Sequence, residues 1–262
     1  MAEFSRQFVQ VMGLRTAYAV QGSGDEAILA LHGWGGSIDS FWPVAQQLAR
    51  QSAYTVYVLD LPGFGESELP PEPWGVPEYA AFVLAFLDRL DLARVHLLGH
   101  SFGGRISLIL GAEHPERIGK IVLANSAGVP NPPNPAREMA VKAAKSLFQL
   151  PGLKRLYEPV RRRAYEQIGA TDYLEAGDLR DTFVKVVEQD LLPYAARVSR
   201  PTLLIWGDRD ADTPLWQGRK LEEVIPDAGL VVFPGAGHFS YLERLPEYVR
   251  IISHFLADKG AD

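Results

Sequence analysis

Residues 95–104, with the sequence Val-His-Leu-Leu-Gly-His-Ser-Phe-Gly-Gly, constrain the fold of this chain more than any other stretch. A short apolar run that favours a β-strand stops at Gly99, and an apolar pattern with helical spacing begins soon after it. Between them lies the pattern Gly-x-Ser-x-Gly, a turn so tight that its central residue, Ser101, is held in strained backbone geometry. The residues two before and two after Ser101 must be small, because their Cβ atoms would collide with the neighbouring strand and helix. The stretch therefore predicts a strand, a sharp turn and a helix.

The serine at the centre of such a turn is placed for nucleophilic attack. Its hydroxyl stands clear of the sheet at a helix N-terminus, where the helix dipole favours developing negative charge. Serine is a poor nucleophile until a base takes its proton, and a third group must orient that base. Residues 201–207 and 230–234 read as strands, and each is followed by a polar loop. The first loop carries aspartates and the second carries His238, so the chemical groups follow in the order Ser, Asp, His.

Further upstream, residues 28–31 read as a strand that ends in a glycine-rich loop, where a flexible backbone can aim an N–H group at an oxyanion. With these features the chain resembles the α/β-hydrolase-fold serine hydrolases that carry a helical cap, the carboxylesterase type among them. The resemblance covers nearly the whole chain. Epoxide hydrolases and haloalkane dehalogenases are similar in the same motifs but have Asp in place of Ser101. The matching motifs are His-Gly-Trp-Gly-Gly at 32–36, Asp-Leu-Pro-Gly-Phe-Gly-Glu-Ser at 60–67, the turn at 99–103, Gly-Asp-Arg-Asp at 207–210 and Gly-His at 237–238.

The resemblance implies a catalytic machinery on matching positions. Ser101 is the expected nucleophile, and His238 is the expected general base. The backbone N–H groups of Trp34 and Phe102 are the expected oxyanion hole.

Three aspartates, Asp208, Asp210 and Asp212, follow the same predicted strand, and any of them could orient His238. The family pattern Gly-x-x-Asp selects Asp210. In the alternative, Asp208 or Asp212 orients the base and Asp210 caps the helix after Pro214.

Other polar residues near the motifs receive structural interpretations. Asp60 is expected to hold a turn, and His32 to brace the oxyanion loop by hydrogen bonding. His100 is adjacent to Ser101 in sequence, yet we expect its side chain to point away from the nucleophile.

Charge and composition exclude several classes of function. A formal net charge of −6 disfavours broad nucleic-acid affinity, and the absence of cysteine excludes a thiolate catalyst and a disulfide framework. No His-Glu-x-x-His motif and no Gly-x-Gly-x-x-Gly after a strand is present, so we expect no metal and no cofactor. The N-terminus opens without an apolar run long enough for secretion or membrane insertion, from which we expect a cytoplasmic protein that does not bind a membrane. The sequence does not indicate an oligomeric state.

Alternating strands and helices predict parallel βαβ units in an α/β fold, and 262 residues suffice for one mostly parallel, doubly covered sheet. This rhythm breaks after Gly128. A proline-rich stretch at 130–135 precedes three helical patterns, at 137–150, 153–167 and 178–192. We therefore expect an α/β-hydrolase core over 1–129 and 197–262, with an inserted helical cap over 130–196.

A cap at this position covers the catalytic end of the sheet, excludes water and shapes the substrate pocket. Most of its apolar side chains should stabilise the cap against the core, and a minority should face Ser101. The candidates are Leu147, Phe148, Leu153, Tyr157, Tyr173, Phe183 and Val187.

These features predict a serine hydrolase that cleaves carboxylic esters of small apolar substrates through an acyl-enzyme. Two alternatives stay open: hydrolysis of the carbon–carbon bond of ring-fission dienones, or binding of a small molecule as a sensor with little turnover. Ring-fission hydrolases commonly have His-Gly-x-Gly-Pro-Gly in the oxyanion loop and a tryptophan after the catalytic histidine. Here Gly36 and Ser37 stand where proline and glycine would follow, and Phe239 follows His238. Such dienones also need a polar anchor for a carboxylate, and no convincing anchor is visible in the sequence. The ester substrate is therefore ranked first.

Overall fold

The computed structural model describes residues 5–51, 53–130 and 176–258. Within these ranges, eight strands form one sheet in the order β1-β2-β4-β3-β5-β6-β7-β8. β1 and β2, and β2 and β4, pair antiparallel, and all other neighbours pair parallel, which confirms the predicted mostly parallel sheet. The strands are β1 Gln7–Val11, β2 Leu14–Gly22, β3 Glu26–Leu31, β4 Tyr54–Leu59, β5 Val95–His100, β6 Ile118–Ala124, β7 Thr202–Gly207 and β8 Ala228–Phe233.

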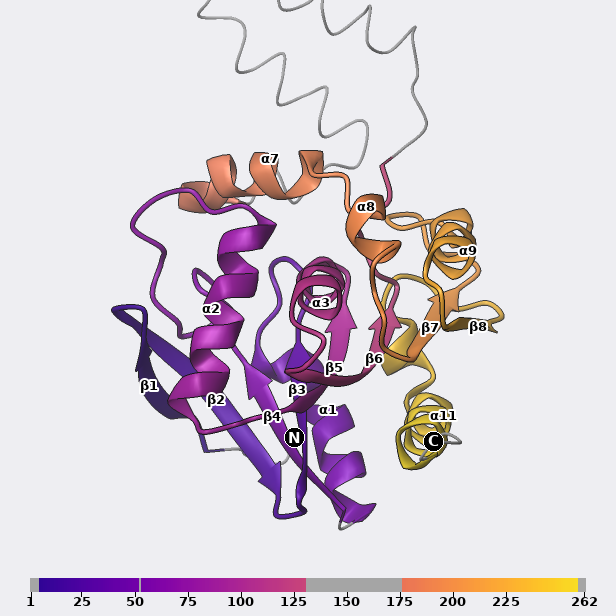
Figure 1. The fold of residues 1–262 in the computed structure, drawn as a ribbon, viewed down its shortest axis with the longest axis horizontal. Coiled ribbons are helices and arrows are strands. Elements are labelled where there is room, and N and C mark those ends of the chain that lie inside the picture. Colours follow the sequence, from indigo (N-terminus) through magenta and orange to yellow (C-terminus); the bar gives the residue numbers. More distant parts are fainter. Residues whose placement is uncertain (1–4, 52, 131–175, 259–262) are drawn as a thin grey trace, which may run out of the picture.

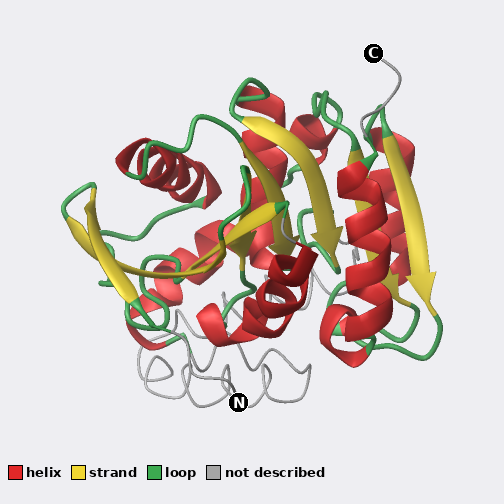
Figure 2. Ribbon diagram, turned by 90° about the horizontal axis from the view of Figure 1, so that it is seen from below, coloured by secondary structure: helices red, strands yellow, loops and turns green. Residues whose placement is uncertain are grey.

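Helices cover both faces of this sheet (Figure 1, Figure 2). Successive side chains of a strand point to opposite faces, so Leu29 and Leu31 of β3 belong to one buried cluster and Ile28 and Ala30 to the other. The first cluster includes residues of α2 Val76–Arg89, α3 Phe102–Glu113, α7 Arg180–Glu188, α8 Leu192–Ala195 and α9 Leu215–Val224. The second includes residues of α1 Ile38–Leu48, α10 Ser240–Glu243 and α11 Leu245–Ala257.

The turn between β5 and α3 has the strained geometry that the sequence predicts. Ser101 lies at φ 48° and ψ −105°, in a region that non-glycine residues rarely adopt. A Cβ atom on Gly103 would lie 2.0 Å from the carbonyl oxygen of Leu31, and one on Gly99 would lie 2.8 Å from that of Gly103. The helix therefore packs backbone against backbone at the end of β3, and only glycine permits this approach.

The predicted helix over 178–192 is wrong as a single element. The structure has a 3-10 turn over Gly177–Leu179, then α7, and α8 begins only at Leu192. The chain is extended at Gln189, and the Asp190 carboxylate accepts a hydrogen bond of 2.9 Å from the Leu192 N–H. This bond and the proline at the start of α8 favour a new helix start. The predicted helices at 137–150 and 153–167 lie outside the described residues, so the division into core and cap stays a prediction.

In the parts of the chain that the structure describes, no helix combines the length and the apolar character needed to cross a membrane.

The close approach at the elbow predicts a stability difference between two glycines. Gly103→Ala should lower the free energy of unfolding by about 3 kcal/mol, because the new Cβ meets a sheet backbone atom that cannot move freely. Gly229→Ala, on β8, should change it by less than about 0.5 kcal/mol, since no atom lies within 4 Å of the added Cβ. Urea unfolding of both variants measures the difference. Equal losses would show that close approach is not the reason for glycine at position 103.

Candidate active site

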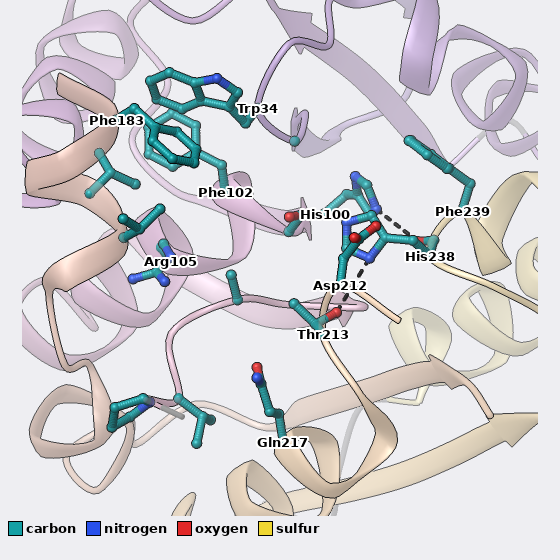
Figure 3. A pocket seen from close by; sticks show the side chains of 17 residues that line it. Trp34, His100, Phe102, Arg105, Phe183, Asp212, Thr213, Gln217, His238 and Phe239 are labelled. Atoms are coloured by element: carbon teal, nitrogen blue, oxygen red, sulfur yellow. Dashed lines mark hydrogen bonds between the residues drawn. The ribbon is translucent and has the colours of Figure 1, made fainter. Parts of the chain in front are cut away.

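Three of the predicted residues meet at the carboxyl ends of parallel strands. Ser101 directly follows β5, Asp210 follows β7 and His238 follows β8. Ser101 and His238 line one cavity of about 410 Å³ (Figure 3). Asp210 lies behind His238, 5% exposed, and its Oδ2 accepts a hydrogen bond of 2.9 Å from Nδ1 of the imidazole. This bond places the proton on Nδ1 and leaves Nε2 able to accept one.

Asp210 receives hydrogen bonds from several segments of the chain. Besides His238, its Oδ2 accepts bonds of 2.6 Å from Nδ2 of Asn125 and 2.6 Å from Oγ1 of Thr213. Its Oδ1 accepts from the backbone N–H groups of Asp212 and Thr213, at 2.8 and 2.9 Å. Burial raises the pKa of Asp210, but its bonds to His238 and Thr213 outweigh burial and the pKa is lowered. The carboxylate is therefore ionised and can stabilise a protonated imidazole.

The other two aspartates of this loop have different surroundings. Asp208 Oδ1 accepts a hydrogen bond of 2.7 Å from the N–H of Gly235, and Asp212 is exposed on the rim of the cavity. Of these three aspartates, all of them among the described residues, only Asp210 is hydrogen-bonded to His238. The structure thus places the aspartate that the family pattern selects, Asp210, against His238.

One group of described side chains could hold a metal ion by proximity. Ligand atoms of Asp210, Asp212 and His238 lie within 4.8 Å of one another. Both oxygens of Asp210 and Nδ1 of His238 are, however, already engaged in the bonds described above. A hydrogen-bond network accounts for this cluster, and we assign no metal to it.

The predicted oxyanion hole lies beside Ser101. The N–H of Gly103 donates to the carbonyl oxygen of His32 at 3.0 Å, which ties the glycine loop to the elbow. A Cβ on Gly33 would lie 3.2 Å from Cβ of Ser101, so the loop passes directly over the nucleophile. Trp34 and Phe102 both line the cavity, and within the described ranges neither backbone N–H donates to another backbone or side-chain group. Two donors are therefore available to an oxyanion.

His32 braces the glycine loop, as its sequence setting predicts. Its Nδ1 donates to the carbonyl oxygen of Gly33 at 2.7 Å, and its Nε2 accepts from the N–H of Leu61 at 3.0 Å. Burial lowers the pKa of His32 to about 4, so the ring is neutral at physiological pH. Asp60 likewise has the expected structural role, because its carboxylate accepts from the N–H groups of Ile38 and Glu66.

The expectation for His100 is wrong. Its side chain does not point away from the site but lines the same cavity as Ser101 (Figure 3). Nε2 donates to the carbonyl oxygen of His238 at 3.0 Å, and the two rings lie 4.8 Å apart. Burial, and then the neighbouring His238, lower the pKa of His100 to about 3. The ring is therefore neutral and holds the loop that carries the base.

Sequence reasoning also missed the groups that support Asp210. Asn125 follows β6 with φ 46°, donates to Asp210, and accepts from Oγ of Ser240 through its Oδ1. Thr213 donates to the same carboxylate. An asparagine at the end of a strand is a signal for positive φ, but its partners come from distant loops that the sequence does not place.

Aromatic and aliphatic side chains form one part of the cavity walls, and polar side chains form the rest. Phe183 and Val187 are among the apolar ones, so two of the predicted cap residues do line the pocket, while the other five candidates lie outside the described residues. Rings of Trp34 and Phe183 meet edge to face at 5.0 Å, which joins α7 to the glycine loop. The apolar lining is completed by Phe102, Ala127, Val129, Pro130, Val186 and Phe239, and the other polar side chains are Arg105, Asp212, Thr213 and Gln217.

Comparison with known proteins assigns the class. A family model described as alpha/beta hydrolase fold matches residues 26–153, and one described as TAP-like protein matches residues 185–261. The chain belongs to the α/β-hydrolase fold family, and it is a hydrolase.

Particular relatives are similar over most of the chain. The 2-hydroxy-6-oxononadienedioate/2-hydroxy-6-oxononatrienedioate hydrolase of Escherichia coli is 28% identical, over 93% of this chain and 91% of the relative. The enol-lactonase of Burkholderia xenovorans LB400 has a TM-score of 0.72 at 26% identity and covers 96% of this chain and 100% of its own. A bacterial membrane phospholipase A has a TM-score of 0.77 at 27% identity, with 97% and 86% covered.

The contacts of the aspartates predict unequal effects of neutralising them. Asp210→Asn should slow the reaction of Ser101 with a fluorophosphonate probe by roughly 10³–10⁴-fold, because the amide favours the wrong imidazole tautomer. Asp208→Asn should slow it by less than about tenfold, since its partner is a surface loop. Labelling rates at neutral pH measure both. A larger loss for Asp208→Asn would move the orienting role to that residue.

Two buried neutral histidines predict a loss of stability in acid. The folded pKa values of His32 and His100, about 4 and about 3, lie below the ordinary value of 6.5, so protonation favours the unfolded chain. Their contribution is complete above pH 6.5 and is lost as the pH falls toward 4, at about 1.4 kcal/mol per pH unit for each ring. Urea unfolding between pH 7 and pH 5 measures this slope. His100→Asn should lower the slope by about 1.4 kcal/mol per pH unit. A slope that this substitution leaves unchanged would contradict the assignment.

Proposed function

We propose that Ser101, His238 and Asp210 form a catalytic triad that hydrolyses a bond to a carbonyl carbon through an acyl-enzyme. The observation that carries this proposal is the 2.9 Å bond between His238 Nδ1 and Asp210, in the cavity wall beside a serine in strained geometry. That bond leaves Nε2 of His238 to take the proton of the serine hydroxyl.

In the first half of the reaction, Oγ of Ser101 bonds to the carbonyl carbon while His238 takes its proton. The N–H groups of Trp34 and Phe102 stabilise the oxyanion. Its collapse breaks the bond to the leaving group, which receives the proton from His238. Water then attacks the acyl-enzyme, gives one proton to His238 and releases the acid, and that proton returns to Ser101.

For the substrate we propose a ring-fission dienone, in which the leaving group is the carbon of a dienol. The similarity to the E. coli dienedioate hydrolase over 93% of this chain supports this choice. The absence of a visible polar anchor in the sequence is one of the features that favour an ester. The cavity does contain polar side chains, Arg105 and Gln217, which removes that objection.

An ester is the second candidate. The similarity to an enol-lactonase supports it, since a lactone is a cyclic ester. The apolar walls of the cavity would suit the acyl chain of either substrate.

The two substrates can be ranked directly. Wild-type protein should hydrolyse 2-hydroxy-6-oxononadienedioate with a higher kcat/KM than p-nitrophenyl butyrate, measured at one enzyme concentration. Ser101→Ala should lower both activities by about 10³-fold or more and should lose fluorophosphonate labelling. A higher kcat/KM for the ester would reverse the ranking, and labelling retained by Ser101→Ala would refute the nucleophile.

A further inference from the structure

Arg105 is a buried cation in the wall of the catalytic cavity. It lies on α3 four residues after Ser101, and residues at this spacing share one face of a helix. Its side chain is 8% exposed and borders the cavity (Figure 3).

Its guanidinium group has N–H donors that no described residue accepts from. Nη1 donates to the backbone carbonyl of Gln189 at 3.0 Å, and among the described residues no carboxylate pairs with it. Burial lowers the pKa of Arg105 to about 10, so the group stays charged at neutral pH. Its Nε and Nη2 make no hydrogen bond to any residue that the structure describes. A buried charge without a counter-charge is costly, and an anion entering the cavity would relieve that cost.

Gln217 is a second buried polar residue in the wall of the cavity. It lies on α9, is 4% exposed and lines the cavity. Its side-chain amide makes no hydrogen bond to any residue in the described ranges. Figure 3 shows it on a different helix from Arg105 and away from the ring of His238.

We propose that Arg105 binds a carboxylate group of the substrate, with Gln217 as an additional donor. The planar guanidinium matches the two oxygens of a carboxylate. The exposed carboxylate of Asp212 lies at the rim near His238, where it repels a second negative charge and so favours the orientation toward Arg105. This inference rests on the proposed function and names its substrate class: a carbonyl compound that carries a free carboxylate, whichever bond is cleaved.

A pair of esters with the same chain length tests the anchor. Mono-p-nitrophenyl glutarate differs from p-nitrophenyl valerate only by a carboxylate in place of the terminal methyl group. Arg105→Met should raise KM for the glutarate ester by about 30-fold or more with little change in kcat, because the substrate carboxylate loses its partner. The valerate ester should keep its KM. Arg89→Gln, which removes an exposed charge on α2, should change neither.

Binding without turnover provides an independent measurement. Glutarate titrated calorimetrically into the Ser101→Ala protein should bind, and adding Arg105→Met should abolish the heat of binding. Arg105→Lys keeps the charge and should retain part of the affinity for glutarate. This variant replaces Arg105→Met in the experiment if the methionine variant does not fold. If Arg105 only ties α3 to the chain at Gln189, its replacement will impair both esters equally and leave glutarate binding intact, which would overturn the proposal. Glutarate binding by a wild-type protein that hydrolyses neither ester nor dienone would instead refute the proposed function alone.

Discussion

The backbone contact between the start of α3 and the end of β3 is the constraint on which the rest of the site depends. The N–H of Gly103 donates to His32 and the position has no room for a Cβ, so the helix, the strand and the glycine loop are held in one arrangement. That arrangement puts Ser101 in a strained conformation, and it brings beside Ser101 two N–H groups that have no partner in the part of the chain that the structure describes. Close packing around Ser101 holds this strained conformation in place. The nucleophile is therefore already in position before the substrate binds.

Asp210 is the second residue on which the arrangement of the site depends, because it orients His238 and also holds several loops together. Its five hydrogen-bond donors come from the ends of three strands, β6, β7 and β8, so one buried carboxylate holds these loops together. Donors of this number satisfy a carboxylate almost fully, which compensates for its removal from water. His100 completes the arrangement by donating to the backbone of His238 from the neighbouring strand. His238 is thus held in two places, through its imidazole by Asp210 and through its backbone carbonyl by His100.

Local patterns were sufficient to predict the strands, the elbow and the three residues that meet at the site, because periodicity, glycine spacing and strand ends are local signals. The partners of those residues were not predictable in this way. Asn125 and His100 form hydrogen bonds with loops that are far away in sequence. Which loops these side chains can reach depends on how the strands are ordered in the sheet. The break at Gln189 was missed because apolar residues at helical spacing continue across it. Arg105 could have been noticed as a charge within the apolar pattern of α3, but only the cavity shows what it borders.

The charges of the cavity give its two ends different chemistry. At one end Asp210 and the rim residue Asp212 favour a positive imidazole, which stabilises His238 after it has taken a proton. At the other, Arg105 is a cation whose one partner among the described residues is a backbone carbonyl, and an unpaired buried charge lowers stability unless a ligand supplies the counter-charge. A site that retains such a charge gives up stability in the empty state and recovers it on binding. An anionic substrate therefore fits the electrostatics of both ends, since its carboxylate and its reacting carbonyl are drawn to groups of suitable charge, whereas a neutral ester uses only one of them.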